Sequence, residues 1–296
     1  MDAHPRPGGL APRVPGASVH DRGTGSRGTV RGTGSVSAFR ERYGPWALVA
    51  GASAGLGEAF SRQLAAHGVN LLLLARRREP LERLASSLRA AHGIEARVAT
   101  VDLAHGDLPV VVEELAAGLE VGLLVYNAAH SVIGPFVDRP LQEHLRVVEV
   151  NCRGPVVLSH LLGSAMARRG RGGIVLMTSL SGSQGNPWLS TYAASKAFNL
   201  VLGEGLWAEL GTRGVDVVAC RAGATRTAGF EASHPKRAVP LQAAEEVAAQ
   251  ALAALGHGPS VVTGGLNRLA AFAFGRLFPR RASIRIMERA TRRLYE

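Results

Sequence analysis

The segment Trp46–Gly57 reads WALVAGASAGLG and decides the fold. Its first five residues are apolar and predict a short buried strand. Glycines follow at positions 51, 55 and 57, where they permit a tight turn and the close approach of a pyrophosphate to the backbone. A helix beginning near Leu56 would then offer free N–H groups and the positive end of its dipole to that anion. The segment therefore predicts a strand, a phosphate-binding turn and a helix in succession.

Short apolar runs alternate with helical stretches after this segment. This alternation predicts a doubly wound parallel sheet of about seven strands in one α/β domain, with helices on both faces. The expected strands are 46–50, 70–75, 96–101, 121–126, 173–179, 215–220 and 260–263. The expected helices are 56–67, 79–92, 107–118, 138–151, 154–169, 189–211 and 241–256.

A second informative segment, Thr191–Lys196, reads TYAASK. Of 34 basic residues only Lys196 and Lys236 are lysines, and arginine supplies every other positive charge. Positions four apart share one face of a helix, so the side chains of Tyr192 and Lys196 should point the same way. A nearby cation favours a phenolate, so we expect Lys196 to lower the pKa of Tyr192 from about 10 toward neutrality. Tyr192 could then act as a general acid or base.

Two further polar residues lie upstream in a fixed order. Ser179 ends the apolar run 173–179, which is typical of a buried parallel strand, and Asn151 precedes Gly154-Pro155. Ser179 could instead cap a helix, with Ser181 as a rival for its role, and Asn151 could end a helix.

Taken together, the glycine segment, Asn151, Ser179 and the Tyr192/Lys196 pair resemble the classical short-chain dehydrogenase/reductase family over about residues 45–262. The resemblance implies a Rossmann fold and hydride transfer between a nicotinamide cofactor and a carbonyl or alcohol carbon. It implies that Tyr192 protonates the developing alkoxide during reduction, and that Lys196 lowers the pKa of Tyr192 and holds the nicotinamide ribose. Ser179 would bond the substrate oxygen, and Asn151 would anchor a water of the proton relay.

The resemblance also implies a cofactor site. Its expected residues are Gly51, Ser53, Gly55, Leu56, Gly57, Arg76, Asp102, Leu103, Asn127, Tyr192, Lys196, Gly223 and Thr227. The chain departs from the family pattern in having Ala50 for Thr, Tyr126 for Asn, Ala129 for Gly and Arg221 for Pro.

The residues after the second expected strand favour NADP(H) over NAD(H). An NAD-preferring site places a carboxylate there for the ribose 2′-hydroxyl, whereas this chain has Ala75 followed by Arg76. A guanidinium can bind a 2′-phosphate bidentately. A solvated run of three arginines, 76–78, is the alternative interpretation.

The formal charge of +11 comes almost entirely from the two ends of the chain. Residues 1–44 carry +4 and residues 265–296 carry +6, which leaves +1 for the rest. Basic tails of this kind are more often solvated or membrane-surface elements than specific DNA readers, and no nucleic-acid-binding motif is present. Neither the two cysteines nor the ten histidines have a metal-ligand spacing, so no metal is expected, and the cysteine usage favours the cytoplasm.

Both ends of the chain lie outside the expected domain, 45–263. Residues 1–44 are rich in Gly, Pro, Ser and Arg and are predicted to be a flexible tail without a secretory signal; a transit peptide or an overextended gene start would give a similar pattern. Residues 264–296 predict a basic amphipathic helical extension. It could be a helix packed on its own domain, a pocket lid, an oligomer contact or a peripheral membrane contact.

The substrate is expected to be a small, apolar carbonyl or alcohol compound, held by residues 182–189, the loop 224–240 and the C-terminal extension. Trp188 and Leu189 could give the pocket an apolar wall. The resemblance also implies a homo-oligomer formed through helices such as 154–169 and 189–211. Two other functions remain open: a noncatalytic nucleotide-binding or scaffold protein on the same fold, and a basic adaptor that uses only the tails.

Overall fold

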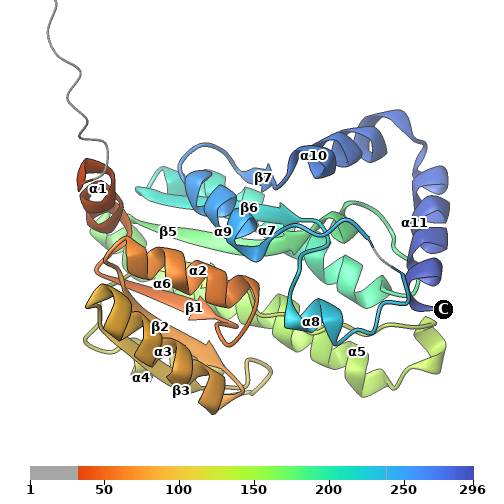
Figure 1. Cartoon of the computed structure of the whole chain (residues 1–296). Helices are drawn as coiled ribbons and strands as arrows, with labels where there is room; N and C mark the ends of the chain where they lie inside the picture. The colour runs from red at the N-terminus through yellow and green to blue at the C-terminus, as the bar shows by residue number, and fades with distance from the viewer. Residues whose placement is uncertain (1–32, 238) are drawn as a thin grey trace, which may run out of the picture.

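A seven-stranded parallel sheet forms the centre of the computed structural model, which describes residues 33–237 and 239–296 (Figure 1). The strand order is β3-β2-β1-β4-β5-β6-β7. The strands are β1 (Trp46–Ala50), β2 (Asn70–Ala75), β3 (Ala96–Thr100), β4 (Val121–Tyr126), β5 (Gly172–Ser179), β6 (Val215–Ala222) and β7 (Ser260–Val262). The predicted fold class and all seven predicted strands are confirmed, with strand ends within two residues of expectation.

The chain changes its winding direction at β1, which pairs with β2 on one side and β4 on the other. In open parallel sheets, ligands bind beyond the carboxyl ends of the strands at such a switch point. The glycine-rich turn after Ala50 lies at that place. The sheet topology therefore positions the predicted phosphate-binding turn.

Helices cover both faces of the sheet because successive strand residues point to opposite sides. In β2, Leu71 and Leu73 face one core and Leu72 and Leu74 face the other. Burying each such leucine contributes roughly 1.5–3 kcal/mol relative to leaving it exposed. The first core packs against α2 (Leu56–Ala66), α3 (Arg78–His92) and α9 (Ala244–Ala253), and the second against α4 (Leu108–Ala116), α6 (Gly154–Arg169) and α7 (Ser190–Gly211).

The helix α1 (Thr33–Tyr43) corrects the predicted extent of the N-terminal tail. Tyr43 is buried, and its hydroxyl donates to Asp216 at 2.8 Å, while Arg42 forms an ion pair with the same carboxylate at 3.0 Å. Phe39 stacks on His67 with ring centroids 4.5 Å apart. These tertiary contacts stabilise a helix that its Gly- and Ser-containing sequence would not favour alone. The rest of the predicted tail, residues 1–32, lies outside the described residues.

The C-terminal extension is helical, as predicted. It consists of α10 (Gly265–Phe272), a π-helical turn η4 (Ala273–Leu277) and α11 (Arg280–Tyr295). Figure 1 shows α5 (Leu141–Val148), α8 (Ala228–Glu231) and α11 on the side of the molecule toward which the strand arrows point. Among the residues described, no helix is long and apolar enough to cross a lipid bilayer.

Candidate active site

The glycine turn forms a cradle that side chains would fill. Gly51 and Gly55 have φ of 85° and 59°, in the left-handed region that favours glycine. A Cβ on Gly57 would lie 2.0 Å from the carbonyl oxygen of Gly51. The helix α2 begins here with no side-chain cap, so the N–H groups of its first turn keep their capacity to bind an anion. This geometry fits the pyrophosphate of a dinucleotide.

Residues that follow β4 and β6 brace this turn. Asn127, after β4, donates from Nδ2 to the carbonyl oxygen of Gly51 at 3.1 Å. Thr227, after β6, packs against Gly55, where an added Cβ would lie 2.8 Å from the Thr227 Cβ. Gly223 has Asn267 of α10 directly against it, since a Cβ on Gly223 would lie 2.4 Å from Nδ2 of that residue. The predicted cofactor residues of β1, β4 and β6 therefore meet at one edge of the sheet.

Arginines lie at the end of β2, close to the glycine turn. Arg76 is exposed at the end of β2, and the Arg77 side chain extends to the Ser53 hydroxyl at 3.4 Å. Arg146 of α5 donates to the Asp102 carboxylate at 2.8 Å, and Leu103 beside it is buried. Burial acts to raise the pKa of Asp102, but the hydrogen bonds from Arg146 and Ala104 and the charges of Arg146 and Arg76 hold it below its ordinary value.

Asn151 is fully buried in a π-helical turn, η2 (Glu149–Arg153), between α5 and α6. Its Nδ2 donates to the His130 carbonyl at 2.9 Å, and its Oδ1 accepts from the His130 N–H at 2.7 Å. Nδ2 also donates to the Ser195 hydroxyl at 2.9 Å, which donates to the Tyr192 carbonyl at 2.7 Å. Asn151 therefore fixes the start of α7, which carries Tyr192. Single-turn π-helices recur at functional sites.

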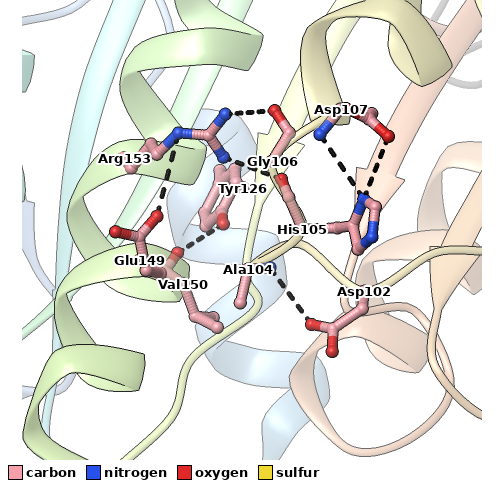
Figure 2. A network of polar contacts seen from close by, with 9 residues as sticks. All are labelled: Asp102, Ala104, His105, Gly106, Asp107, Tyr126, Glu149, Val150 and Arg153. Carbon is pink, nitrogen blue, oxygen red and sulfur yellow. Dashed lines mark hydrogen bonds and ion pairs between the residues drawn. The ribbon is translucent and has the colours of Figure 1, made fainter. Parts of the chain in front are cut away.

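A polar network fixes the π-helical turn (Figure 2). The Tyr126 hydroxyl donates to the Val150 carbonyl at 2.5 Å, one residue before Asn151. Arg153 donates to the carbonyls of His105 and Gly106 at 2.9 and 2.7 Å and lies 3.7 Å from the Glu149 carboxylate.

Gly154 completes this arrangement, because a Cβ there would lie 2.1 Å from the Tyr126 hydroxyl oxygen. Tyr126, at a position where the family pattern has Asn, thus sets the position of the turn that carries Asn151. Sequence reasoning treated this substitution only as a departure from the pattern and missed its role.

Lys196 is buried beside Tyr192 on α7, as the four-residue spacing predicts. Its ammonium lies 5.6 Å from the centroid of the Tyr192 ring and donates to the Met177 carbonyl of β5 at 2.9 Å. Burial lowers the pKa of Lys196 to about 8, while the nearby Cys152 acts in the opposite direction. The lysine is therefore held in one place by the sheet.

The pKa of Tyr192 differs from the sequence-based expectation. Burial raises it above its ordinary value, a hydrogen bond with Ser179 lowers it, and Tyr295 of α11 raises it. Because burial is the largest of these causes, the pKa of Tyr192 lies above its ordinary value, whereas the sequence led us to expect a value below it. The Ser179 hydroxyl also accepts from the Ser181 N–H at 3.2 Å, so it caps the short 3₁₀ helix η3 (Leu180–Ser183) as well as reaching Tyr192.

The C-terminal helix α11 packs against the segment that follows Ser179 and lies close to Tyr192. Thr291 donates to the Asn186 side chain at 2.8 Å, and Ile284 lies against Gly185. The Tyr295 hydroxyl lies 3.4 Å from the Ser233 hydroxyl, and Tyr295 contributes to raising the pKa of Tyr192. Sequence reasoning did not identify Tyr295, since no motif marks it and only the helical spacing of Ile284, Met287 and Leu294 signals the helix.

Comparison with known proteins identifies the family. Residues 45–238 match the short chain dehydrogenase family model. The chain is 31% identical over 236 residues to a 7beta-hydroxysteroid dehydrogenase of Collinsella aerofaciens, covering 78% of this chain and 90% of the relative. It is 38% identical over 181 residues to a very-long-chain 3-oxoacyl-CoA reductase of Pyricularia oryzae, covering 60% and 55%.

The fold has close counterparts among solved structures. A short-chain dehydrogenase from Sphingobium yanoikuyae in complex with NADPH superimposes with a TM-score of 0.68 at 28% identity, covering 78% of this chain and 93% of that one. The chain thus belongs to the short-chain dehydrogenase family and is a dehydrogenase/reductase acting on CH–OH or C=O groups.

Proposed function

We propose that the protein is an NADP(H)-dependent oxidoreductase that reduces an apolar ketone or aldehyde, with Tyr192 as the general acid. The observation that carries this proposal is the convergence of Tyr192, Ser179 and Lys196 at the carboxyl end of β5. A neutral phenol is the form that donates a proton, as the reduction of a carbonyl group requires.

Each of the three residues has a separate part in the proton transfer. The Tyr192 hydroxyl protonates the substrate oxygen as negative charge develops on it, and the Ser179 hydroxyl donates to the same oxygen and orients it. The Lys196 ammonium, held by Met177, stabilises the phenolate that forms and contacts the nicotinamide ribose. Asn151 holds the start of α7 through Ser195 and anchors a water through which Lys196 exchanges protons with solvent.

The glycine turn and the first turn of α2 bind the cofactor. The bound nicotinamide supplies or accepts the hydride. The backbone at Gly51, Ser53, Leu56 and Gly57 holds the pyrophosphate beside Gly55. The remaining cofactor contacts are Asp102 and Leu103 at the adenine, Asn127 beside Gly51, and Gly223 and Thr227 at the carboxamide.

The preference for NADP(H) is assigned to Arg76. This exposed guanidinium follows β2, and Arg77, whose side chain lies beside the Ser53 hydroxyl, adds positive charge next to the glycine turn. The side chain at position 75 is an alanine, so no carboxylate there repels a 2′-phosphate. The structurally similar Sphingobium yanoikuyae enzyme was solved in complex with NADPH.

The apolar character of the substrate is proposed from Trp188 and Leu189, which precede α7. Trp188 has φ of 71°, a strained value for a bulky side chain, and its carbonyl accepts from the Gly134 N–H at 2.9 Å. We assign the wall of the substrate site to Trp188, Leu189 and α11, whose Arg292 lies 6.0 Å from the centroid of the Trp188 ring. The relatives named for hydroxysteroid and 3-oxoacyl-CoA chemistry support this class of carbonyl compound.

Self-association is proposed through α5, α6 and α7. Leu141, Leu145 and Val148 lie at helical spacing on α5 and are exposed, as are Phe198 and Val201 on α7. Burying such a face between copies would remove it from water, and light scattering measures the resulting mass.

A cytoplasmic location is proposed from two unpaired cysteines.

A peripheral membrane contact is assigned to α10. Leu266, Leu269 and Phe272 are each more than half exposed, with Arg268 among them. Co-sedimentation with anionic vesicles tests this contact.

Cofactor titration followed by a carbonyl panel tests the proposed function. NADPH should bind more tightly than NADH, and NADPH absorbance should fall when an apolar ketone is added. Tyr192→Phe should abolish turnover while NADPH still binds. Failure of the wild-type protein to bind either nicotinamide cofactor would refute the proposal.

A further inference from the structure

His144 of α5 is a buried polar residue outside the catalytic group. It is 8% exposed, and the buried residues of α5 are His144 and Val147. The same helix leaves Leu141 and Leu145 exposed to solvent. Burying an imidazole while leucines stay in water is unfavourable unless the ring makes specific hydrogen bonds. The orientation of α5 therefore depends on the contacts of His144.

Both ring nitrogens of His144 have a partner. Nε2 lies 3.0 Å from the Phe136 carbonyl oxygen, and Nδ1 lies 2.7 Å from the Thr191 hydroxyl. Because a carbonyl oxygen can only accept, these partners assign the ring proton to Nε2. Nδ1 is then an acceptor, and the Thr191 hydroxyl donates to it. Thr191 is the residue directly before Tyr192.

The contact with Thr191 is one of two hydrogen bonds by which α5 and η2 hold the first two turns of α7. The other runs from Asn151 to Ser195 at 2.9 Å. His144 and Asn151 are about two helical turns apart, so both lie on the side of their helical segment that faces α7. Their partners Thr191 and Ser195 have the i, i+4 spacing of one helix face. Tyr192 lies between these two points of attachment.

We propose that His144 is a positioning residue for the reaction, which fixes the Tyr192 hydroxyl at the substrate oxygen through Thr191. Asn151 holds the second turn of α7, and His144 holds the first turn, which carries Tyr192. Proton transfer requires the donor within hydrogen-bond reach of the acceptor, and a displacement of about 1 Å can cost about 100-fold in rate. This inference rests on the proposed function, because it takes Tyr192 as the general acid.

Two substitutions at position 144 separate the two hydrogen bonds. In His144→Asn the amide oxygen is as many bonds from the backbone as Nδ1 and can accept from Thr191, whereas the donor to Phe136 is lost. In His144→Gln the amide nitrogen takes the place of Nε2 and can donate to Phe136, whereas the acceptor for Thr191 is lost. Each variant loses one hydrogen bond, so a merely structural role predicts the same behaviour for both.

The kinetic test measures kcat with NADPH and the ketone that wild type reduces fastest in the carbonyl panel. His144→Gln should lower kcat about 10-fold, whereas His144→Asn should stay within about twofold of wild type. Thr191→Val removes the hydroxyl at similar volume and should reproduce the loss, and the double variant His144→Gln/Thr191→Val should show no further loss. The Kd for NADPH should change less than about twofold in every variant. Equal kcat values for His144→Asn and His144→Gln, or additive losses in the double variant, would overturn the inference.

Amide hydrogen exchange separates failure of this contact from failure of the proposed function, because it requires no turnover. Peptides that span residues 190–197 should exchange faster in His144→Gln and Thr191→Val than in wild type and His144→Asn. Faster exchange in those two variants alone supports the hold of His144 on the start of α7, even if no carbonyl compound is reduced and the proposed function is wrong. Wild-type exchange in all the variants would show that the inference is wrong, even where carbonyl reduction is observed.

Discussion

Replacing the buried Lys196 with methionine should stabilise the protein while removing its activity. Burial lowers the pKa of this lysine from 10.5 to about 8. One pKa unit corresponds to about 1.4 kcal/mol, so holding the ammonium in place costs the folded state about 3 kcal/mol at pH 7. Methionine has a similar length and no charge. It loses the hydrogen bond to Met177, worth about 1 kcal/mol. The net gain in the free energy of unfolding is about 2 kcal/mol.

The gain should depend on pH with a definite sign. Below about pH 8 the lysine is protonated in both the folded and unfolded states, so the cost is fully present. Between about pH 8 and pH 10.5 the unfolded chain binds the proton more strongly, so the wild type becomes more stable as the pH rises. Most of the advantage of Lys196→Met should therefore be gone by pH 10.

Urea unfolding followed by circular dichroism at pH 7 and pH 10 measures this difference. A gain of about 2 kcal/mol corresponds to a rise of about 4–8 °C in Tm for a chain of this size. Lys236→Met, at the only other lysine, is the matched control and should change stability by less than about 0.5 kcal/mol. A Lys196→Met protein that is less stable than wild type at pH 7, or whose difference does not change with pH, would refute the reasoning.

Three further substitutions test separate parts of the site. Arg76→Ser should raise the KM for NADPH about 10- to 100-fold in steady-state assays, because a charged hydrogen bond to the 2′-phosphate is lost. The KM for NADH should stay unchanged. An equal effect on both cofactors would argue against binding of the 2′-phosphate by Arg76. Tyr126→Phe should lower the free energy of unfolding by about 1–3 kcal/mol, since the Val150 carbonyl loses its partner, and should also lower kcat; a variant with wild-type urea unfolding and wild-type kcat would contradict the positioning role. Gly57→Ala should weaken NADPH binding at least about 10-fold by calorimetry, because the new Cβ collides with the Gly51 carbonyl and shifts the phosphate-binding turn; unchanged affinity would show that the turn adapts.

The sheet could be predicted because its signals are local. Buried parallel strands such as β1 and β4 are uninterrupted apolar runs, and the glycines at positions 51 and 55 mark the turn between strand and helix. The four catalytic candidates were recognised together by their order along the chain. The fold then brings Asn151 to Ser195 and Lys196 to Met177, contacts that no spacing rule would give.

Features that depend on tertiary packing were not predictable. The helix α1 exists because Tyr43 and Arg42 find Asp216, about 170 residues away. The π-helical turn depends on Tyr126 reaching Val150 across the sheet edge. The pKa of Tyr192 rises because the fold buries the phenol, and the four-residue spacing on which the expectation was based carries no information about that burial.

The basic extension illustrates a different limit. Its charge and its helices were evident from the sequence, but its place over the catalytic group was not. Only the contacts of Thr291 with Asn186 and of Tyr295 with Ser233 put α11 beside Tyr192. Amphipathic spacing indicates that a helix has a buried face and leaves open which surface that face covers.

Reduction of an apolar ketone by NADPH, compared between wild type and Tyr192→Phe, tests the central claim most directly. Stopped-flow absorbance of the nicotinamide follows the reaction, and fluorescence titration gives the Kd for NADPH. The account predicts a loss of about 10²- to 10⁴-fold in kcat, the range for removing a general acid, with the Kd changed less than about twofold. A Tyr192→Phe protein that reduces the ketone at the wild-type rate would contradict it.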